Sequence, residues 1–544
     1  MVRRWRDLQK TAATILLAAL CGFASYCRAD EASALRLYRQ AILPSGAILR
    51  GDRGANGAVE GSDAACVNCH RRSGFGTAEG KFIIPPIAGK YLFRPHGDRP
   101  EDIDFRYRPG FVPKREPYTD ASLARAIRDG IGRDGKPLNT LMPRFALDDA
   151  AMADLIAYLK KLSSDPTPGV SDDTLHFATI ITPDADPVKR QGMLDVLNRF
   201  FRDKNEFIRG GLQPMRSDKG VMYRVSRKWQ LHVWELSGPA STWEQQLHAL
   251  SAAEPVFAVV SGLGGTDWAP IHRFCEQASI PCLLPNVELP VDAEQDFYSI
   301  YFSREVLLEA QLIAHRLGED ETAAGRRRAV QIFRQGDVGE QAAGALEAAL
   351  KRRGWKSESR VLKTGAAREL ARAVDRIEPG DVLILWLRPP DLALLPAGAA
   401  KSQTVFVSGL MAQLENAPLP PSWRGTVRMT YPFDLPEVRK VRMNFPLGWF
   451  KVSNIAVVNE RVQSDTYLAC RILSESLGDM LDSFVREYLV EQVEAMLSRR
   501  LVNGYYPRLG LAPGQRFASK GGYIVRFANP DSMQPAIDGA WIVP

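Results

Sequence analysis

Residues 66–70 read Cys-Val-Asn-Cys-His, and this spacing of two cysteines and a histidine is that of a c-type haem attachment site. Two thiols on one helical turn can add to neighbouring vinyl groups of the haem, and the histidine that follows can bind the iron. We therefore predict one haem c, held covalently by Cys66 and Cys69, with His70 as an iron ligand. A structural zinc site would need four ligands, and no second pair of Cys or His residues follows at a suitable spacing.

Two helices are predicted after this motif, with a loop between them. The first begins at Thr119, a good N-cap residue, and ends before Gly130. The second begins after Asp148, and its apolar residues recur at the spacing of one buried helical face: Met152, Leu155, Ile156 and Leu159. Residues 139–145 follow neither a helical nor a strand period, and we predict that they form a loop that carries Met142.

The haem motif, the Met142-Pro143 pair in a loop and the closing amphipathic helix together resemble a monohaem class I cytochrome c across residues 30–162. The resemblance implies an all-α domain in which His70 is the proximal iron ligand and the Met142 thioether is the distal one. Ligation by His and Met leaves the iron six-coordinate and raises its reduction potential. We therefore expect one-electron transfer with a redox partner protein, on the side of a dehydrogenase or of a terminal oxidase.

The resemblance also concerns the residues around the ligands. In the family a proline carbonyl accepts a hydrogen bond from the proximal histidine, and the matching position is Pro86, which precedes Gly89. Two other residues remain alternatives for the distal ligand. They are His96, in a long stretch rich in Pro, Arg and Asp, and Met152, on the apolar face of the closing helix.

Residues 1–29 combine an arginine-rich start, an apolar stretch and a small-x-small end, which is the pattern of a secretory signal peptide. The stretch is too short for a membrane span, and the alternative is that it stays as an uncleaved N-terminal anchor. We expect a periplasmic protein with no stable membrane span after cleavage, because haem attachment of this kind takes place outside the cytoplasm. Removal of this segment lowers the formal net charge from +7 to +3, which gives no support for nucleic-acid binding.

Three cysteines lie outside the signal segment and the haem motif. Cys275 and Cys282 are close in sequence, and in an oxidising compartment we predict a disulfide between them. Cys470 belongs to an apolar helical pattern, and we predict a buried free thiol there.

Residues 163–173 contain Ser, Pro, Asp and Gly without an apolar period, and we predict an interdomain linker. Beyond it, apolar strand-like runs alternate with helical patterns through residues 174–544, and this order restarts near residue 303. Strands that alternate with helices form parallel sheets with helices on both faces. The two successive halves predict two α/β lobes with a cleft between them.

This order of elements, with local sequences such as Ala-Val-Val-Ser-Gly at 258–262, resembles the type I periplasmic binding proteins. The group in question is the branched-chain amino-acid receptor-like group of ABC transporter substrate-binding proteins. The resemblance implies that the loop after the third strand holds a ligand carboxylate through backbone N–H groups and a hydroxyl. The matching residues are Ser261, Gly262 and Thr266, and the alternative is that Thr266 only caps the helix that follows.

The ends of the later strands predict the residues of the second lobe that face the cleft: Tyr301, Ser303, Asp337, Trp386, Arg388 and Tyr431. Amino-acid binders of this family hold the ligand ammonium group with an acidic residue after a late strand, whereas residues 407–412 contain no acid. We therefore predict a small anionic or polar solute rather than an amino acid, with Arg388 as the partner of an anion.

The predicted protein is multi-domain, with an all-α cytochrome c domain followed by a two-lobed α/β domain that is similar to periplasmic binding proteins. We expect an electron carrier, not an enzyme, whose second domain senses a solute or docks a partner. Some relatives of that domain are associated with quinoprotein alcohol dehydrogenases, which by analogy makes such an enzyme a candidate partner. One alternative is a transporter-type substrate-binding protein or solute sensor with an accessory haem. An enzyme is the other, and an open iron position would favour it.

Overall fold

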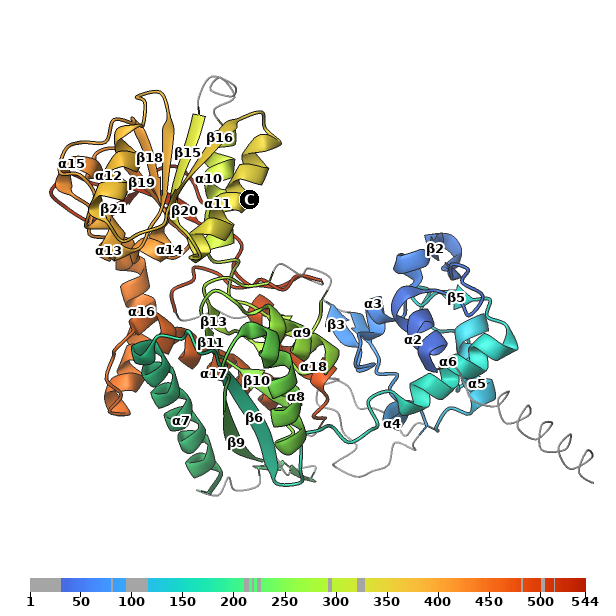
Figure 1. Ribbon diagram of the computed structural model, residues 1–544. Helices are drawn as coiled ribbons and strands as arrows, with labels where there is room; N and C mark the ends of the chain where they lie inside the picture. The colour runs from blue at the N-terminus through green and yellow to red at the C-terminus, as the bar shows by residue number, and fades with distance from the viewer. Residues whose placement is uncertain are drawn as a thin grey trace, which may run out of the picture. The chain divides into compact units, whose positions relative to one another are not determined.

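The computed structural model (Figure 1) describes residues 31–79, 82–93, 116–209, 215–217, 220–222, 227–291, 296–319, 328–480, 483–499, 504–512 and 514–544. The described chain forms two compact units. One contains the described residues up to Pro166 together with those of 214–224, and the other contains the rest from Thr167 on. The predicted signal segment, residues 1–29, and His96 lie outside the described residues.

The first unit is mainly helical. Helices α2, α4 and α5 all pack against α6, and the apolar face predicted for α6 is buried in the core of the unit. The Thr119 side chain caps α5 in a capping box with Ser122, and the Asp148 side chain caps α6 by accepting from the Ala151 N–H at 2.8 Å. The helices are α2 (Glu31–Gln40), α3 (Val67–His70), α4 (Gly89–Leu92), α5 (Asp120–Asp129) and α6 (Asp149–Lys161).

Two small antiparallel sheets accompany these helices. In one, β1 (Arg50–Asp52) pairs with both β2 (Ala58–Glu60) and β5 (Arg144–Phe145), and in the other β3 (Thr77–Glu79) pairs with β4 (Phe82–Ile84). The predicted all-α description omitted these sheets, because strands of two or three residues are too short to carry an alternating apolar pattern.

The predicted linker, residues 163–173, spans the boundary between the two units. Its second half packs onto the second unit. Val170 forms an antiparallel bridge with Leu175, and a Cβ on Gly169 would lie 2.1 Å from the backbone nitrogen of Phe257. Because the φ angle of Gly169 is also positive, at 81°, this close approach requires glycine.

The first lobe of the second unit is built on a seven-stranded parallel sheet. In Figure 1, α7 lies on one side of the sheet and α8 and α9 lie on the other. The strands are β6 (Thr174–Ile181), β9 (Lys228–Glu235), β10 (Ala258–Val260), β11 (Leu263–Gly264), β12 (Cys282–Leu283), β13 (Asn286–Val287) and β14 (Ser299–Ile300). The helices are α7 (Pro187–Arg209), α8 (Trp243–Ala253), α9 (Ala269–Gln277), α17 (Glu460–Met480) and α18 (Arg486–Arg499). A hairpin of β7 (Met215–Ser217) and β8 (Gly220–Met222) lies between α7 and β9 in the chain but belongs to the first unit.

The second lobe has a seven-stranded sheet in the order β16-β15-β17-β18-β19-β20-β21. The first five strands run parallel, as the alternating pattern predicts. Strand β20 pairs antiparallel with β19, and β21 pairs antiparallel with β20. The strands are β15 (Arg328–Arg334), β16 (Lys356–Leu362), β17 (Val382–Trp386), β18 (Thr404–Val407), β19 (Val427–Tyr431), β20 (Tyr523–Phe527) and β21 (Pro535–Ile537). The helices are α10 (Val306–Gly318), α11 (Val338–Lys351), α12 (Ala367–Asp375), α13 (Pro389–Leu392), α14 (Gly409–Ala412) and α15 (Pro421–Arg424).

The chain passes between the lobes more than once. Residues 301–305 lead from β14 to α10, helix α16 (Pro436–Val452) leads from β19 back toward α17, and a third segment leads from α18 to β20. A cavity lies between the two lobes, and residues of the connecting segments, among them Glu305 and Arg439, contribute to its lining. None of the helices in the described parts of the chain has both the length and the apolar character needed to cross a membrane.

Candidate haem and solute sites

His70 ends helix α3 and is fixed by a backbone carbonyl. Its Nδ1–H donates to the carbonyl oxygen of Pro85 at 3.0 Å, which leaves Nε2 as the nitrogen that can bind iron. The side chain is buried, and this burial lowers the pKa of the imidazole to about 4 against the opposing effect of the Pro85 carbonyl. The ring is therefore neutral at neutral pH, as metal ligation requires.

The β3–β4 hairpin brings Pro85 to the histidine. Thr77 pairs with Ile84, so the residues just outside this pair, Gly76 and Pro85, lie at the open end of the hairpin. The Gly76 N–H donates to the carbonyl oxygen of His70 at 3.1 Å. A Cβ on Gly76 would lie 2.1 Å from the Ile84 carbonyl oxygen, and the φ angle is 69°, so the approach depends on glycine.

The acceptor predicted for the histidine N–H was Pro86, and that prediction is wrong by one residue. The structure assigns the hydrogen bond to Pro85. The register of the β3–β4 hairpin determines which carbonyl group faces the His70 ring. The prediction rested on the spacing to Gly89, which does not determine this register.

Cys66 and Cys69 lie on the same turn as His70, and the His70 N–H donates to the Cys66 carbonyl oxygen at 2.9 Å. Neither cysteine forms a disulfide in the described chain. Burial raises the pKa of the Cys66 thiol to about 12, so in the folded domain this thiol is protonated and a poor nucleophile.

The loop that carries Met142 is held together by Arg144, the first residue of β5. The Arg144 guanidinium donates to the carbonyl oxygens of Met142 and, at 2.9 Å, of Leu138. The Met142 N–H donates to the Asn139 carbonyl oxygen at 3.1 Å. The Met142 side chain is partly buried against the same apolar core as Cys66. The donor set therefore fits haem c, since it offers two thiols, a neutral imidazole and a thioether around one core.

The second site is a cleft between the two lobes of the α/β unit, with a cavity of about 880 Å³. Its charged lining is predominantly acidic. Seven acidic and four basic side chains line it: Asp184, Asp186, Glu288, Glu305, Glu415, Glu460 and Asp465, with Lys189, Arg388, Arg439 and Arg461.

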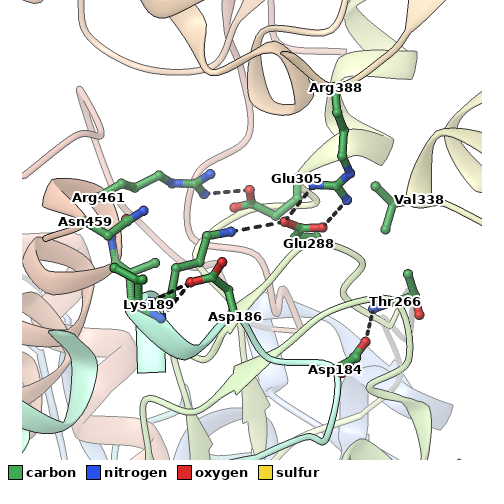
Figure 2. Close-up of polar contacts among 12 residues, drawn as sticks. Asp184, Asp186, Lys189, Thr266, Glu288, Glu305, Val338, Arg388, Asn459 and Arg461 are labelled. Atoms are coloured by element: carbon green, nitrogen blue, oxygen red, sulfur yellow. Dashed lines mark hydrogen bonds and ion pairs between the residues drawn. The ribbon is translucent and has the colours of Figure 1, made fainter. Parts of the chain in front are cut away.

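Arg388 links the lobes through two carboxylates. Its Nε and Nη2 donate to the two oxygens of Asp337 in its own lobe, each at 2.7 Å. Nη2 also lies 2.6 Å from Glu288 Oε2 in the first lobe (Figure 2). Lys189 Nζ lies 3.4 Å from the other oxygen of Glu288. Burial acts to raise the pKa of Glu288, but the two cations hold it below its usual value. Arg388 is therefore already neutralised by the protein.

A second charged cluster lies where α17 begins. Arg461 Nη2 lies 2.6 Å from Glu305 Oε2, and Arg461 Nε lies 3.5 Å from Asp465 Oδ2. The other carboxylate oxygen of Asp465, Oδ1, is buried without a hydrogen-bond partner in the described structure. Burial raises the pKa of Asp465 to about 7, although Arg461 favours its ionised form.

The loop after β11 holds the carboxylate of Asp184, which comes from the loop after β6. The Thr266 N–H donates to Asp184 Oδ2 at 3.2 Å, as Figure 2 shows, and the Thr182 hydroxyl donates to Asp184 Oδ1. A Cβ on Gly265 would lie 2.3 Å from Asp184 Oδ2, so the glycine makes room for this carboxylate.

Comparison with known families identifies the first of these sites.

Residues 55–163 match the family model for cytochrome c.

The matched segment contains the haem motif, the Met142 loop and helix α6. The haem site thus lies in a cytochrome c domain, a family in which haem serves electron transfer.

A search of curated proteins found no match for the chain. Among solved structures, similar chains are substrate-binding proteins of ABC transporters. A branched-chain amino-acid ABC transporter protein from Thermus thermophilus with bound valine is 9% identical, with a TM-score of 0.48, and the match covers 69% of this chain and 98% of that one. A fatty-acid ABC transporter substrate-binding protein from Thermomonospora curvata is 14% identical, with a TM-score of 0.47 and coverages of 70% and 95%. A periplasmic substrate-binding protein from Ralstonia solanacearum is 12% identical, with a TM-score of 0.47 and coverages of 67% and 100%.

Only some of the residues predicted for solute binding line the cleft. Thr266 and Arg388 do, and Asp337 lies behind Arg388. The expectation that Arg388 serves an anion does not fit the geometry, because its guanidinium is already bonded to two carboxylates. Gly262 is buried and accepts the Asn286 N–H through its carbonyl oxygen instead of facing the cavity.

The remaining predicted residues are buried behind the cleft surface. The Ser261 hydroxyl lies 3.2 Å from the Thr466 hydroxyl, and the Ser303 hydroxyl donates to Glu305. The other three form side-chain hydrogen bonds: Tyr301 with His272, Trp386 with Gln331, and Tyr431 with Glu415 and Arg439.

The predicted disulfide is also absent from the described structure. Cys275 and Cys282 are both buried free thiols, and a hydrogen bond from Cys282 together with burial raises the pKa of Cys275. Cys470 is a buried free thiol, as predicted.

The cleft also contains functional candidates that the sequence analysis missed. Glu288 follows strand β13, so a rule based on strand ends could have found it. Asp184 follows β6 in the same way. Asp465 offers no such signal, because it lies inside helix α17 among buried residues on every side.

Proposed function

We propose that this protein is a periplasmic electron carrier with one haem c, bound covalently through Cys66 and Cys69, and that its α/β unit binds a small solute in the cleft. The observation that carries the proposal is the state of His70. Its imidazole is buried and neutral, and the Pro85 carbonyl fixes the tautomer so that Nε2 is the metal-binding nitrogen.

The chain's own residues define the ligand field. Haem c would supply the reversible uptake and release of one electron. The Pro85 carbonyl orients the His70 ring and increases its basicity. Arg144 holds the loop from which Met142 would provide the second iron ligand. A haem held by both His70 and Met142 would suit electron transfer rather than oxygen chemistry, so we propose a carrier between a dehydrogenase and a terminal oxidase.

A second candidate function, a solute-binding protein or sensor with an accessory haem, is favoured by the cleft. Its cavity of about 880 Å³ is within the size range of small-molecule sites. The two functions differ in what a solute does. A binding protein gains stability with solute concentration, whereas a domain that only docks a partner does not.

The test is an optical spectrum of the protein exported with haem-maturation machinery, in the oxidised and reduced states. We expect a weak near-infrared sulfur-to-iron band that Met142→Ala removes. Leu141→Ala is the matched control, because the neighbouring Leu141 is about half exposed and its truncation leaves the thioether in place. A wild-type spectrum that lacks the band, or that is high-spin, would overturn Met142 as the ligand.

A further inference from the structure

We propose that the cleft selects a small organic amine that carries no carboxylate, and that the amine's ammonium group binds at Asp465. The inference rests on the solute-binding part of the proposed function and names its ligand class. Three observations carry it: the pairing of every basic side chain in the cleft lining, the position of Asp184, and the unpaired oxygen of Asp465.

The charges of the cleft oppose an anion. Each of the four basic side chains in its lining is already paired with a protein carboxylate: Lys189 with Glu288, Arg388 with Glu288 and Asp337, Arg439 with Glu415, and Arg461 with Glu305. The seven acidic side chains outnumber the four basic ones, so the ionised lining carries an excess of negative charge. An anionic ligand would have to displace a protein carboxylate, whereas a cation would meet an excess of them.

A protein carboxylate occupies the place predicted for a ligand carboxylate. The backbone N–H of Thr266, which the sequence analysis assigned to that role, donates to Asp184 Oδ2 at 3.2 Å. Asp184 comes from the loop after β6, and Gly265 leaves space for it. A ligand carboxylate here would face Asp184 at close range, and two carboxylates that share one site repel each other. The loop therefore disfavours amino acids and other carboxylates.

Asp465 supplies the partner for a cation. It is 2% exposed and lines the cavity, and its Oδ1 is a buried acceptor with no donor in the described structure. Leaving such an acceptor unpaired costs free energy, which a ligand N–H would recover. The group formed by Glu305, Arg461 and Asp465 holds two carboxylates and one guanidinium, so its excess charge matches one ammonium group.

Apolar side chains beside Asp465 suit the carbon chain of such a ligand. The Tyr506 hydroxyl lies 3.4 Å from Asp465 Oδ2, and the Tyr506 ring stacks on Phe302 at 5.2 Å between centroids. Phe302 and Val462 both line the cavity. A short alkyl chain on the amine would therefore contact aromatic and aliphatic carbon while its ammonium group reaches the carboxylate.

The experiment is calorimetric titration of the haem-loaded, full-length protein with n-butylamine, 1-butanol, butyrate and leucine. Phosphate buffer at pH 8 keeps Asp465 ionised and contains no competing amine. We expect n-butylamine to bind, butyrate and butanol to bind at least tenfold more weakly, and leucine to bind more weakly than n-butylamine. Equal affinity for n-butylamine and butanol, a preference for butyrate or leucine, or no binding of any probe would overturn the proposal.

Variants locate the site. Asp465→Asn should weaken n-butylamine binding by about tenfold or more, the size of one charge-assisted hydrogen bond. Glu378→Gln removes the same charge from an exposed position outside the cleft and should leave the affinity unchanged. An unchanged affinity in Asp465→Asn would place the amine elsewhere and overturn the assignment.

If Asp465→Asn fails to fold, the probe selectivity of the wild type still decides the ligand class. The haem spectrum reports the proposed electron transfer separately, so a failure of either proposal is distinguishable.

Discussion

Glu309 on α10 shows how burial sets the charge of a single residue. Its side chain is fully buried, and its two oxygens accept from the Ser408 and Thr430 hydroxyls and from the Leu410 N–H at 3.0 Å. Burial raises the pKa of this carboxyl to about 7, although the three donors favour the ionised form. The carboxyl is therefore protonated in the folded lobe at pH values where it is ionised in the unfolded chain.

We predict that this carboxyl makes the second unit less stable as the pH rises from about 4.5 to 7. Below this window both states hold the proton. Within it the unfolded chain releases the proton while the folded lobe keeps it, so the free energy of unfolding falls, by at most about 3 kcal/mol. Glu309→Gln should flatten this slope. The measurement is the thermal unfolding midpoint between pH 5 and 8 for both proteins. The slope left in the variant reports other groups, including Asp465, whose pKa is raised in the same direction.

For single residues, the sequence predicts the chemical role where that role depends on spacing within a few positions of the chain. The attachment motif and His70 are in this class, since one helical turn determines their geometry. Glu309 and Asp465 are not, because each lies in a helix and receives its properties from distant neighbours. The hydroxyls that surround Glu309 come from residues about 100 and 120 positions later in the chain, and no local pattern reveals them.

The Met142 loop depends on a neighbouring element, the short strand β5. Arg144 on this strand binds the carbonyl oxygens of Met142 and of Leu138, the residue just before the loop. Its guanidinium lies against Gly130, where a Cβ would be 1.7 Å from Arg144 Nε. Arg144 is therefore a positioning residue for Met142. If Met142 is the axial ligand, the loop's rigidity controls how firmly the thioether stays on the iron.

We predict that Arg144→Leu loosens this ligation without removing it at neutral pH. The sulfur-to-iron band should disappear at a lower pH on alkaline titration than in the wild type, and at a lower temperature on heating, because the freed loop exchanges its ligand more readily. The measurement is the near-infrared band as a function of pH. Arg128→Leu is the control, since Arg128 instead holds the Leu147 carbonyl and Asp149 at the start of α6. If both variants shift the band equally, general destabilisation is the cause and the positioning role is wrong.

A close contact between α4 and α6 gives a second prediction for the cytochrome c domain. Gly89 begins α4, and a Cβ there would lie 2.1 Å from the Lys160 carbonyl oxygen, which is backbone and cannot rotate away. Gly89→Ala should lower the free energy of unfolding by about 1–3 kcal/mol through overpacking. Chemical denaturation followed through the haem absorbance measures this change.

Gly344→Ala on α11 is the opposite case. Its Cβ would meet nothing within 4 Å, so we expect a gain of up to about 1 kcal/mol from helix propensity.

The elements differ in how well the sequence predicts them. Helices α5 and α6 carry N-cap residues and apolar helical spacings and occur where the sequence places them. Strands β1 to β5 lack such periods, because two or three residues are too few to show an alternating apolar pattern. Their positions depend on partners that are distant in the chain, as the pairing of β1 with β5 illustrates.

For the α/β unit as a whole, the two lobes are joined by connecting segments and by charged contacts across the cleft. One connection, residues 301–305, ends at Glu305, which adopts a positive φ of 48° although it is not glycine. The Arg461 ion pair and the Ser303 hydroxyl hold its carboxylate in place. The two-lobed architecture follows from the alternating sequence pattern. The contacts that set the separation of the lobes depend on both halves at once, and the sequence did not predict them.

The contact between Glu288 and Arg388 gives a prediction at this scale. Glu288→Gln removes the charge on the first-lobe side, while Arg388 keeps its two hydrogen bonds to Asp337. We expect the free energy of unfolding to change by less than about 1 kcal/mol, because both partners are about one-third exposed and screened by water. The separation of the lobes should nevertheless increase, because this ion pair joins the two sides of the cleft.

The distance between nitroxide labels reports this opening. Cysteines introduced at the exposed Gln245 on α8 and Glu347 on α11 place one label on each lobe, and the native cysteines of this unit are buried and remain unlabelled. We expect Glu288→Gln to shift the distance distribution to longer values. Glu358→Gln is the matched control, because Glu358 pairs with Arg328 inside the second lobe and Arg328 keeps its bonds to Asp381. An unchanged distribution in Glu288→Gln would mean that the connecting segments alone set the separation of the lobes, and the ion pair would then serve only to neutralise Arg388.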